Sequence, residues 1–318
     1  MSDRELDFLS FGEVLVDFFP DEPGRPLSEV PRFTRHVGGA PANVAVALAR
    51  LGRRSGMHTL VGRDDFGVFL RSALSGEGVD VRGVGTHPSA RTGITFVSVG
   101  PKGERSFLFY RHPSADQMIS PTDVDEALIG KARVFHFGSS TLSREPARSA
   151  TLAAVDAARA AGCVVSCDSN VRPHLWEEKG APRRWLEHVM PQVHVLKVAE
   201  DELLATCAMS DPARAAALLR DWGAQLVVVT RADKGCIYDG AEAGTGSVAC
   251  ASVPVVDTTG AGDGFVAGFW TALFELGSLA LTRDAVDAAC LFGHRVAARV
   301  VGALGATAAL PRRAGLVP

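Results

Sequence analysis

The chain has 318 residues, of which 47% are hydrophobic, and a formal net charge of -3 from 33 basic and 36 acidic residues. This length and apolar content suffice for one sizeable core. The balanced charge lacks the basic footprint of a protein that binds nucleic acid or an anionic membrane, so a small-molecule partner is favoured.

The N-terminal residues 1–7 are charged and lack the apolar core of a signal peptide, and no later stretch is long enough to span a membrane. We therefore expect a cytoplasmic protein. The six cysteines are sparse, and the closest pair, Cys163 and Cys167, has neither redox nor zinc-binding spacing. We expect the cysteines to be reduced thiols in the core.

The first half of the chain alternates between two kinds of pattern. Residues 20–35 are rich in proline and charge, whereas residues 42–51 predict a helix that ends at Gly52. Residues 92–110 alternate in two strand-like runs around the turn-like residues 100–103. The segments at 20–35 and 92–110 together predict a small antiparallel sheet inserted in the main domain.

The second half repeats short apolar strands and alanine-rich amphipathic helices. The predicted elements are a strand at 134–137, a helix at 147–161, strands at 164–167 and 226–230, and a helix at 265–276. Because alternating strands and helices bury a strand on both faces, this order predicts an α/β fold with a parallel sheet wrapped by helices.

The most informative stretch is residues 257–264, with the sequence Asp-Thr-Thr-Gly-Ala-Gly-Asp-Gly, just before the last predicted helix. Gly260, Ala261 and Gly262 leave backbone N–H groups free to converge on an anion at a helix N-terminus. Asp263 beside a bound anion would be repelled unless it has chemistry there, such as taking a hydroxyl proton. The stretch therefore predicts phosphoryl transfer, although an aspartate before a helix can also serve only as its N-cap.

The common nucleotide-binding fingerprints are absent. GxGxxG fails because Phe265 stands where the third glycine belongs, and GxxxxGK[ST] does not occur in the chain. A Rossmann dehydrogenase or a P-loop enzyme is therefore disfavoured.

Residues 257–263 resemble the C-terminal signature of the ribokinase-like (PfkB) sugar kinases. Residues 38–52, which read Gly-Gly-Ala-Pro-Ala-Asn-Val-Ala-Val-Ala-Leu-Ala-Arg-Leu-Gly, resemble the first signature of that family in its fructokinase form. Further matches to fructokinases lie at residues 61–67, 103–105, 109–116, 135–139 and 168–176, and the resemblance extends from about residue 8 to 311.

The resemblance implies a three-layer ribokinase-like fold, with a mainly parallel central sheet and a small β-sheet lid. It implies a single kinase domain over residues 1–318, with lid segments at about 16–35 and 92–112. The implied activity is transfer of the γ-phosphate of ATP to D-fructose, with ATP, Mg²⁺ and K⁺ as cofactors. Phe96, Phe107 and Phe109 in the lid indicate a homodimer, since a small isolated sheet cannot bury them alone.

The resemblance also implies a role for each matching residue. Asp263 is the implied base, beside an anion hole of Gly260, Ala261 and Gly262. The sugar site comprises Asp17, Gly38, Gly39, Asn43, Arg111, Asn170 and Arg172. The nucleotide contacts are Lys197, Thr230, Gly235 and His294. The implied Mg²⁺ ligands, through water, are Glu202 and Asp168, and those of K⁺ are Asp257, Thr259, Val300, Ala303 and Gly305.

Three departures from the family pattern are present, of which the first concerns the Mg²⁺ and phosphate shell and the second the nucleotide affinity. Ala199 replaces the usual Asn or Ser before the glutamate, Arg231 and Ala232 replace a Leu-Gly pair, and Ala309 replaces a Ser found in some relatives. We expect altered nucleotide affinity and retained activity, because none of these positions is Asp263.

Two alternatives stay open at the level of the sequence. Arg111 and Arg172 are suited to clamp a carboxylate, which would make 2-keto-3-deoxygluconate the substrate. A catalytically silent sugar-binding regulator with the same fold is the alternative of another class, and the retained Asp263 and glycine turn argue against it. We predict fructose, because residues 110–116 and 168–176 both resemble that branch.

Overall fold

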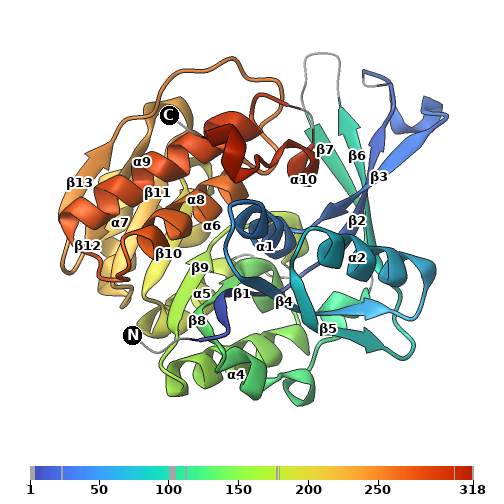
Figure 1. Ribbon diagram of the computed structural model, residues 1–318, viewed down its shortest axis with the longest axis horizontal. Helices are drawn as coiled ribbons and strands as arrows, with labels where there is room; N and C mark the ends of the chain where they lie inside the picture. Colours follow the sequence, from blue (N-terminus) through green and yellow to red (C-terminus); the bar gives the residue numbers. More distant parts are fainter. Residues whose placement is uncertain are drawn as a thin grey trace.

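The computed structural model describes residues 4–22, 24–99, 105–111, 113–176, 178, 180–303 and 305–316. The turn expected at 100–103 and the motif residue His112 lie outside these ranges. The described chain forms two separate sheets with helices packed against the larger one (Figure 1).

The larger sheet has nine strands in the order β13-β12-β11-β10-β9-β8-β1-β4-β5. Neighbouring strands from β5 to β11 pair in parallel, and β12 and β13 pair antiparallel at one edge. The strands are β1 (Leu6–Phe11), β4 (Ser55–Gly62), β5 (Asp80–His87), β8 (Ala132–Gly138), β9 (Val164–Asp168), β10 (Val195–Ala199), β11 (Leu226–Thr230), β12 (Cys236–Gly240) and β13 (Gly244–Val248). The parallel α/β prediction is thus confirmed.

Both faces of this sheet are covered. Val228 of β11 packs in one core with helices α1, α2, α8 and α9, whereas Val227 and Val229 pack in a second core with α4, α5 and α7. A strand buried on both sides needs apolar residues at consecutive positions, which is why the strands read as short apolar runs. The helices are α1 (Ala40–Arg50), α2 (Asp65–Gly76), α3 (Glu126–Ile129), α4 (Ala147–Ala160), α5 (Ala181–Val189), α6 (Leu203–Cys207), α7 (Pro212–Asp221), α8 (Ala261–Glu275), α9 (Arg283–Val300) and α10 (Ala306–Ala309).

The smaller sheet stands beside the main one, at the upper right of Figure 1. Its order is β3-β2-β6-β7, formed by β2 (Leu15–Pro20), β3 (Phe33–Gly38), β6 (Gly93–Val99) and β7 (Arg105–Tyr110). The small sheet expected from the sequence is present, but it is mixed and not antiparallel, because β2 pairs in parallel with β6. The predicted segment 92–110 supplies β6 and β7, whereas most of β2 precedes the predicted segment 20–35. Phe18 and Phe96 stack at 5.2 Å between ring centroids, and this contact joins β2 to β6.

The carboxyl ends of the parallel strands place polar residues along one edge of the main sheet. Glu13 follows β1, Ser140 follows β8, Asn170 follows β9, Glu202 follows β10 and Arg231 follows β11. Ligands of open α/β sheets bind at this edge, so the topology alone locates the candidate site.

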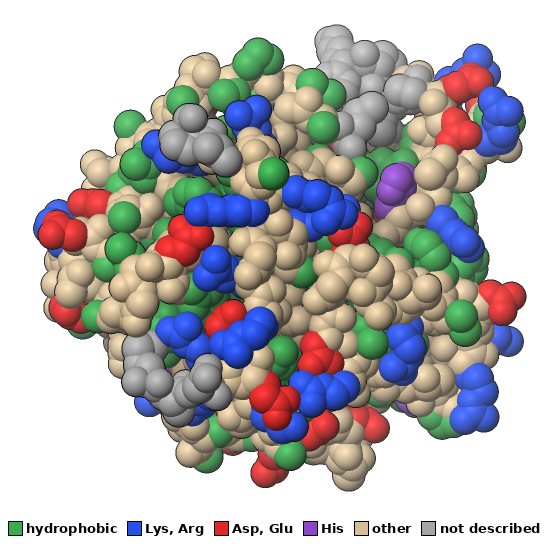
Figure 2. Space-filling model, viewed as in Figure 1, with side chains coloured by type: hydrophobic (Ala, Val, Ile, Leu, Met, Phe, Trp, Pro, Cys, Tyr) green, Lys and Arg blue, Asp and Glu red, His purple; other side chains and the backbone are tan. Residues whose placement is uncertain are grey.

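Charges are mixed on the face seen in Figure 2, where Lys and Arg side chains lie among Asp and Glu side chains. Within the described ranges, no helix combines the length and apolar character needed to cross a bilayer. Five of the six cysteines are buried as predicted, and the exception is the partly exposed Cys250.

Candidate active site

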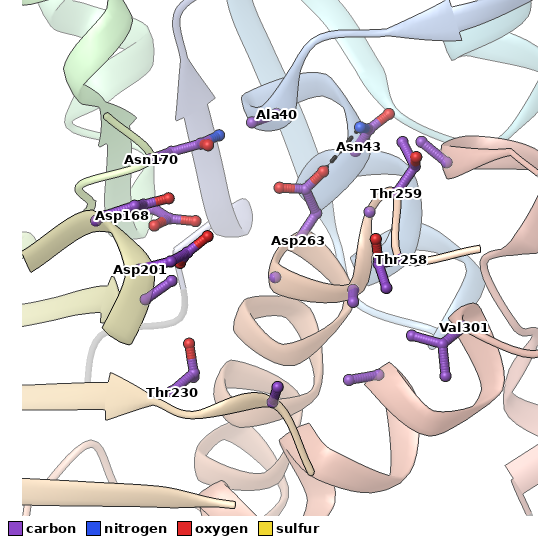
Figure 3. A pocket seen from close by; sticks show the side chains of 18 of the residues that line it. Ala40, Asn43, Asp168, Asn170, Asp201, Thr230, Thr258, Thr259, Asp263 and Val301 are labelled. Carbon is purple, nitrogen blue, oxygen red and sulfur yellow. Dashed lines mark hydrogen bonds between the residues drawn. The ribbon is translucent and has the colours of Figure 1, made fainter. Parts of the chain in front are cut away.

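A cavity of 920 Å³ opens between the carboxyl edge of the main sheet, the small sheet and the N-terminus of α8. Figure 3 shows Asp263 in its centre, with Asn43 on one side and Asp168 and Asp201 projecting from the opposite wall. The predicted residues in the wall are Asp17, Gly39, Asn43, Arg111, Asp168, Asn170, Arg172, Lys197, Glu202, Thr230, Thr259, Gly260, Ala261, Gly262, Asp263 and His294. The structure thus brings together most of the residues selected from the sequence.

The glycine turn is the first turn of α8. This helix begins at Ala261, four residues earlier than the start predicted at 265, because Gly260 is its N-cap with a φ of 80° that favours glycine. Asp263 lies inside the first turn, and its side chain makes no capping hydrogen bond. The interpretation of Asp263 as an N-cap is therefore wrong, and the backbone N–H groups of this turn face the cavity at the positive end of α8.

Asp263 is held by one defined hydrogen bond. The Nδ2 of Asn43 in α1 donates to Oδ2 of Asp263 at 2.8 Å, as the dashed line in Figure 3 shows. Burial raises the pKa of Asp263 to about 7; the Asn43 hydrogen bond and Lys197 oppose this shift, and Asp168 adds to it. A carboxyl group that titrates near neutral pH is suited to accept a proton from a bound hydroxyl.

This pKa predicts the pH dependence of turnover. Asp263 must be ionised to accept a proton, so kcat/KM should rise with pH and level off above about 7. Replacing Asn43 by alanine removes a hydrogen bond that lowers this pKa, so the midpoint should move to higher pH. Rates measured in steps from pH 5 to 9 test both statements, and a profile flat from pH 5 to 8 would contradict them.

A lysine stands against the anion-binding turn. Lys197 of β10 forms a buried ion pair with Asp168, with 3.2 Å between Nζ and Oδ1. A Cβ on Gly262 would lie 2.9 Å from this Nζ, so glycine at 262 lets the ammonium approach the turn closely. Burial works against the charge of Lys197, but Asp168 and Glu202 outweigh it and raise its pKa. Lys197 therefore stays cationic beside the backbone N–H groups of α8.

The other end of the cavity is lined by the small sheet and α1. Asp17 of β2 is buried, and burial, with Asp263 and Glu13 nearby, raises its pKa to about 7 against the effects of Thr95 and Arg111. A Cβ on Gly38 would collide with the Asp17 carboxyl group, so Gly38 supports this wall from behind. Gly39, with a φ of 96°, lies against the main-chain oxygen of Glu13.

The two arginines proposed as a carboxylate clamp already have acidic partners. Arg111 forms a buried ion pair with Asp116, and Nη1 of Arg172 lies 3.3 Å from Oε1 of Glu202. Arg172 is also half exposed. Asp17 and Asp263 line the same cavity. Because Arg111 and Arg172 are both paired with carboxyl groups, neither offers a spare positive charge to an acidic sugar.

The end of the cavity near β11 and α9 holds two of the predicted nucleotide residues. Thr230 and His294 are in its wall, and the His294 ring packs edge-on against Phe265 at 5.0 Å. Gly235 lies outside the cavity wall: it has a φ of 79°, and a Cβ there would collide with the Val248 carbonyl oxygen, so it shapes the turn before β12. Its predicted nucleotide contact has no direct support in this geometry.

The departures at Ala199 and at Arg231 and Ala232 lie on the same end, whereas Ala309 lies outside the cavity wall. Ala199 and Ala232 are in the wall, and Arg231 lies 3.8 Å from Glu200, which also faces Lys234 at 3.7 Å. The sequence pattern could not reveal this pairing, because the two partners come from neighbouring strands. Cys250 also lines this end, and its thiol donates to the Asp233 carbonyl oxygen at 3.1 Å.

The predicted metal residues fall into two groups. Glu202 is buried and accepts a hydrogen bond from the Ser169 hydroxyl at 2.6 Å, and Asp168 is paired with Lys197 as described above. The described side chains contain no cluster of three or more His, Cys, Asp or Glu arranged to hold an ion. Such sparse protein ligation suits Mg²⁺, which keeps much of its water and binds substrate phosphates.

The second group surrounds the loop that precedes α8. Asp257 is buried and accepts hydrogen bonds from the N–H groups of Thr259 at 2.9 Å and Gly305 at 2.6 Å. Val300 ends α9, and its carbonyl oxygen accepts a bond from the N–H of Ala303. Thr259 is in the cavity wall, whereas Asp257, Val300, Ala303 and Gly305 are outside it.

Three residues of the sugar end were missed from the sequence. Glu13, Thr95 and Ser140 line the cavity, and the Ser140 hydroxyl donates to the Glu13 carboxyl group. Ser140 follows the strand predicted at 134–137 and Thr95 lies in the run predicted at 92–110, positions that many unrelated polar residues share, whereas no strand was predicted before Glu13. The pairing of β1 with β8 brings Glu13 and Ser140 together, and Thr95 reaches the cavity from β6 of the small sheet.

Comparison with known proteins identifies the family to which this fold and cavity belong. The model of the pfkB family carbohydrate kinases matches residues 6–313. Fructokinase-2 of Zea mays is 40% identical over 305 residues, covering 95% of this chain and 90% of that protein. The crystal structure of a fructokinase from Vibrio cholerae O395 with fructose, ADP and calcium has a TM-score of 0.86 and 31% identity, covering 99% of this chain and 98% of that one.

A fructokinase from Xylella fastidiosa with bound ATP has a TM-score of 0.84 and 31% identity, covering 97% of this chain and 96% of that one. The match to the family model spans nearly the whole chain and includes both signatures and every strand of the two sheets. The protein therefore belongs to the pfkB family of carbohydrate kinases.

Proposed function

We propose that this kinase transfers the γ-phosphate of ATP to a hydroxyl group of D-fructose. The observation that carries the proposal is the position of Asp263, between a pocket of hydroxyl-binding groups and the N-terminal turn of α8 beside Lys197. Several relatives and structural neighbours are named fructokinases, and this similarity favours fructose as the substrate proposed for this chain.

Fructose would occupy the end of the cavity lined by Asp17, Gly39 and Asn43. The Oδ1 of Asn43 is buried and accepts no hydrogen bond within the described part of the chain, so a sugar hydroxyl would supply its missing partner. Asp17 accepts from hydroxyls, and Asn170 and Arg172 are placed to contact the opposite side of the sugar.

In the transfer step the sugar oxygen would attack the γ-phosphorus, the bond from that phosphorus to the β–γ bridging oxygen would break, and ADP would leave. Asp263 takes the proton of the attacking hydroxyl, while the N–H groups at Gly260, Ala261 and Gly262, together with Lys197, hold the transferred phosphoryl group. Mg²⁺, held through water by Glu202 and Asp168, would neutralise charge on the nucleotide phosphates. Asp257, Thr259, Val300, Ala303 and Gly305 would hold K⁺ behind the turn and fix its conformation.

The small sheet would act as the lid of a single domain that spans the chain. Thr95, Phe107 and Phe109 bring it to the cavity, where Phe109 stacks on His174 of the main domain at 5.3 Å. A lid over the sugar excludes water, which otherwise competes for the γ-phosphate.

The outer strand of this lid predicts a dimer. Strand β7 lies at the edge of the small sheet. It exposes three large side chains, Phe107 by 42%, Leu108 by 48% and Tyr110 by 60%. Exposed apolar edge strands pair with another chain, and a second lid is the partner proposed here. We expect light scattering at micromolar concentration to give twice the monomer mass, and Leu108→Lys to shift the mass toward the monomer. A wild-type monomer would count against this arrangement.

A substrate panel tests the choice of sugar. ADP release should be measured with fructose, ribose and 2-keto-3-deoxygluconate at several concentrations. A charged hydrogen bond contributes about 1.5–3 kcal/mol, so a real carboxylate clamp would favour ketodeoxygluconate by roughly 10- to 100-fold in kcat/KM. Because Arg111 and Arg172 already pair with Asp116 and Glu202, we expect fructose to be preferred. A higher value for ketodeoxygluconate would refute the fructose assignment and leave the kinase assignment standing.

A further inference from the structure

Glu13 is a buried titratable residue in the cavity wall to which neither the sequence nor the mechanism above gives a role. It lies two residues beyond the end of β1, where its side chain meets the cavity beside Asp17 and Gly39. Only 7% of the residue is exposed. Among the described residues Glu13 forms no ion pair, whereas Arg111 pairs with Asp116. A carboxyl group in this position is costly to bury unless it serves a purpose or is neutral.

The hydrogen bonds around Glu13 fix its orientation. The hydroxyl of Ser140, just after β8, donates to Oε2 of Glu13. The main-chain oxygen of Glu13 lies against Gly39, where a Cβ would come within 2.5 Å. Both contacts anchor Glu13 from the side of the main sheet, and its carboxyl group remains part of the wall that faces the sugar.

The charges around Glu13 do not balance if every carboxyl group is ionised. The described charged groups that act on Glu13 most strongly are the guanidinium of Arg111 and the carboxyl group of Asp116, and Arg111 also interacts with Asp17. One buried cation cannot neutralise three buried carboxylates. Asp116 pairs directly with Arg111 and accepts from the Ser114 hydroxyl at 2.6 Å, so Arg111 is already matched by Asp116.

Glu13 and Asp17 are then left without a cation of their own, and burial raises the pKa of both carboxyl groups. Burial, which is the dominant effect, raises the pKa of Glu13 against the opposing effects of Arg111 and the Ser140 hydrogen bond. A protonated carboxyl group is a hydrogen-bond donor as well as an acceptor. With Oε2 engaged by Ser140, the acidic proton is available to the cavity.

We propose that Glu13 acts as a neutral carboxylic acid that donates a hydrogen bond to an oxygen of the bound sugar, opposite the acceptor Asp17. It is a specificity-determining residue: a sugar must present an oxygen acceptor to Glu13 and a hydroxyl donor to Asp17. The inference rests on the proposed function, because it assumes that a sugar occupies this end of the cavity.

Two variants of Glu13 distinguish a hydrogen-bond donor from two other roles, a side chain that only fills space and a side chain whose negative charge is required. Glu13→Gln keeps the shape, an oxygen for Ser140 and an N–H donor for the sugar, so we expect a fructose KM within about threefold of the wild type. Glu13→Leu removes the donor and leaves the sugar oxygen unpaired, so we expect the fructose KM to rise roughly 10-fold or more. The KM for ATP should stay within about twofold in both variants.

Either of two results would overturn the proposal: Glu13→Leu with an unchanged fructose KM, or Glu13→Gln as damaging as Glu13→Leu, which would mean that a negative charge is required. If Glu13→Leu does not fold, Glu13→Asp replaces it. The side chain of aspartate is one methylene group shorter, so Glu13→Asp moves the donor away from the sugar. An unchanged fructose KM in that variant would equally refute the donor role.

The failure of this inference is distinguishable from that of the proposed function. Wild-type protein that turns over no fructose refutes the function before any variant is made. Titration calorimetry of fructose without nucleotide reads the Glu13 contact independently of catalysis. There, a Glu13→Leu variant that binds fructose as tightly as the wild type contradicts the donor role alone.

Discussion

Replacing Asp263 by asparagine is expected to lower kcat by about 10²- to 10⁴-fold, the range typical of a lost general base. Asparagine has the same shape and can still present an oxygen to Nδ2 of Asn43, so sugar and nucleotide binding should be retained. The measurement is steady-state ADP release with fructose, together with the affinity of the variant for ATP. Turnover close to that of the wild type would remove Asp263 from the mechanism.

The stability of the same variant provides an independent control. Burial raises the folded-state pKa of Asp263 to about 7, above its unfolded value, so the stability associated with the protonated form is complete at low pH and is lost as pH rises through 7. Asparagine carries no such charge. Asp263→Asn should therefore melt at a higher temperature than the wild type at pH 8 and show little difference at pH 4, which excludes misfolding as the cause of lost activity.

The second large effect is expected from Lys197→Met. This change leaves the Asp168 carboxylate buried without its partner 3.2 Å away, which costs about 3–5 kcal/mol of folding free energy. It also removes the cation beside Gly262, so kcat/KM for ATP should fall by roughly 10²- to 10³-fold. Urea unfolding and ATP kinetics measure the two losses separately.

The double variant Lys197→Met/Asp168→Asn is the matched control. Removing both charges eliminates the unpaired carboxylate, so much of the lost stability should return. Activity should stay low, because the cation beside the anion-binding turn is still missing. A double variant with wild-type kinetics would show that the ion pair supports only the fold.

The sequence predicted much of this architecture because its strongest signals are local. The strand at 226–230 coincides with β11, and the helix at 147–161 differs from α4 by one residue, since apolar periodicity identifies buried segments directly. The start of α8 was missed by four residues. Gly260, Ala261 and Gly262 look like a loop by propensity, but the left-handed Gly260 starts the helix there.

The candidate site could be predicted only where a compact motif carries it. The turn at 257–263 and the motif at 38–52 each concentrate several functional groups in one stretch. Pairings across the fold left no such signal. The Asn43 contact to Asp263 spans 220 positions, and the Glu13 contact to Ser140 spans 127. Strand order, which no single residue encodes, brings these pairs together.

The central claim is that this chain phosphorylates fructose through Asp263, and the most direct test is product analysis. Purified protein should be incubated with ATP, Mg²⁺ and fructose, and the products quantified by mass spectrometry. We predict one fructose monophosphate for each ADP, with the yield in the Asp263→Asn variant reduced to 1% or less at equal time, the lower bound of the ~10²-fold loss. Fructose and ATP that both bind, with no sugar phosphate formed by the wild type, would contradict the account and indicate a sugar-binding regulator.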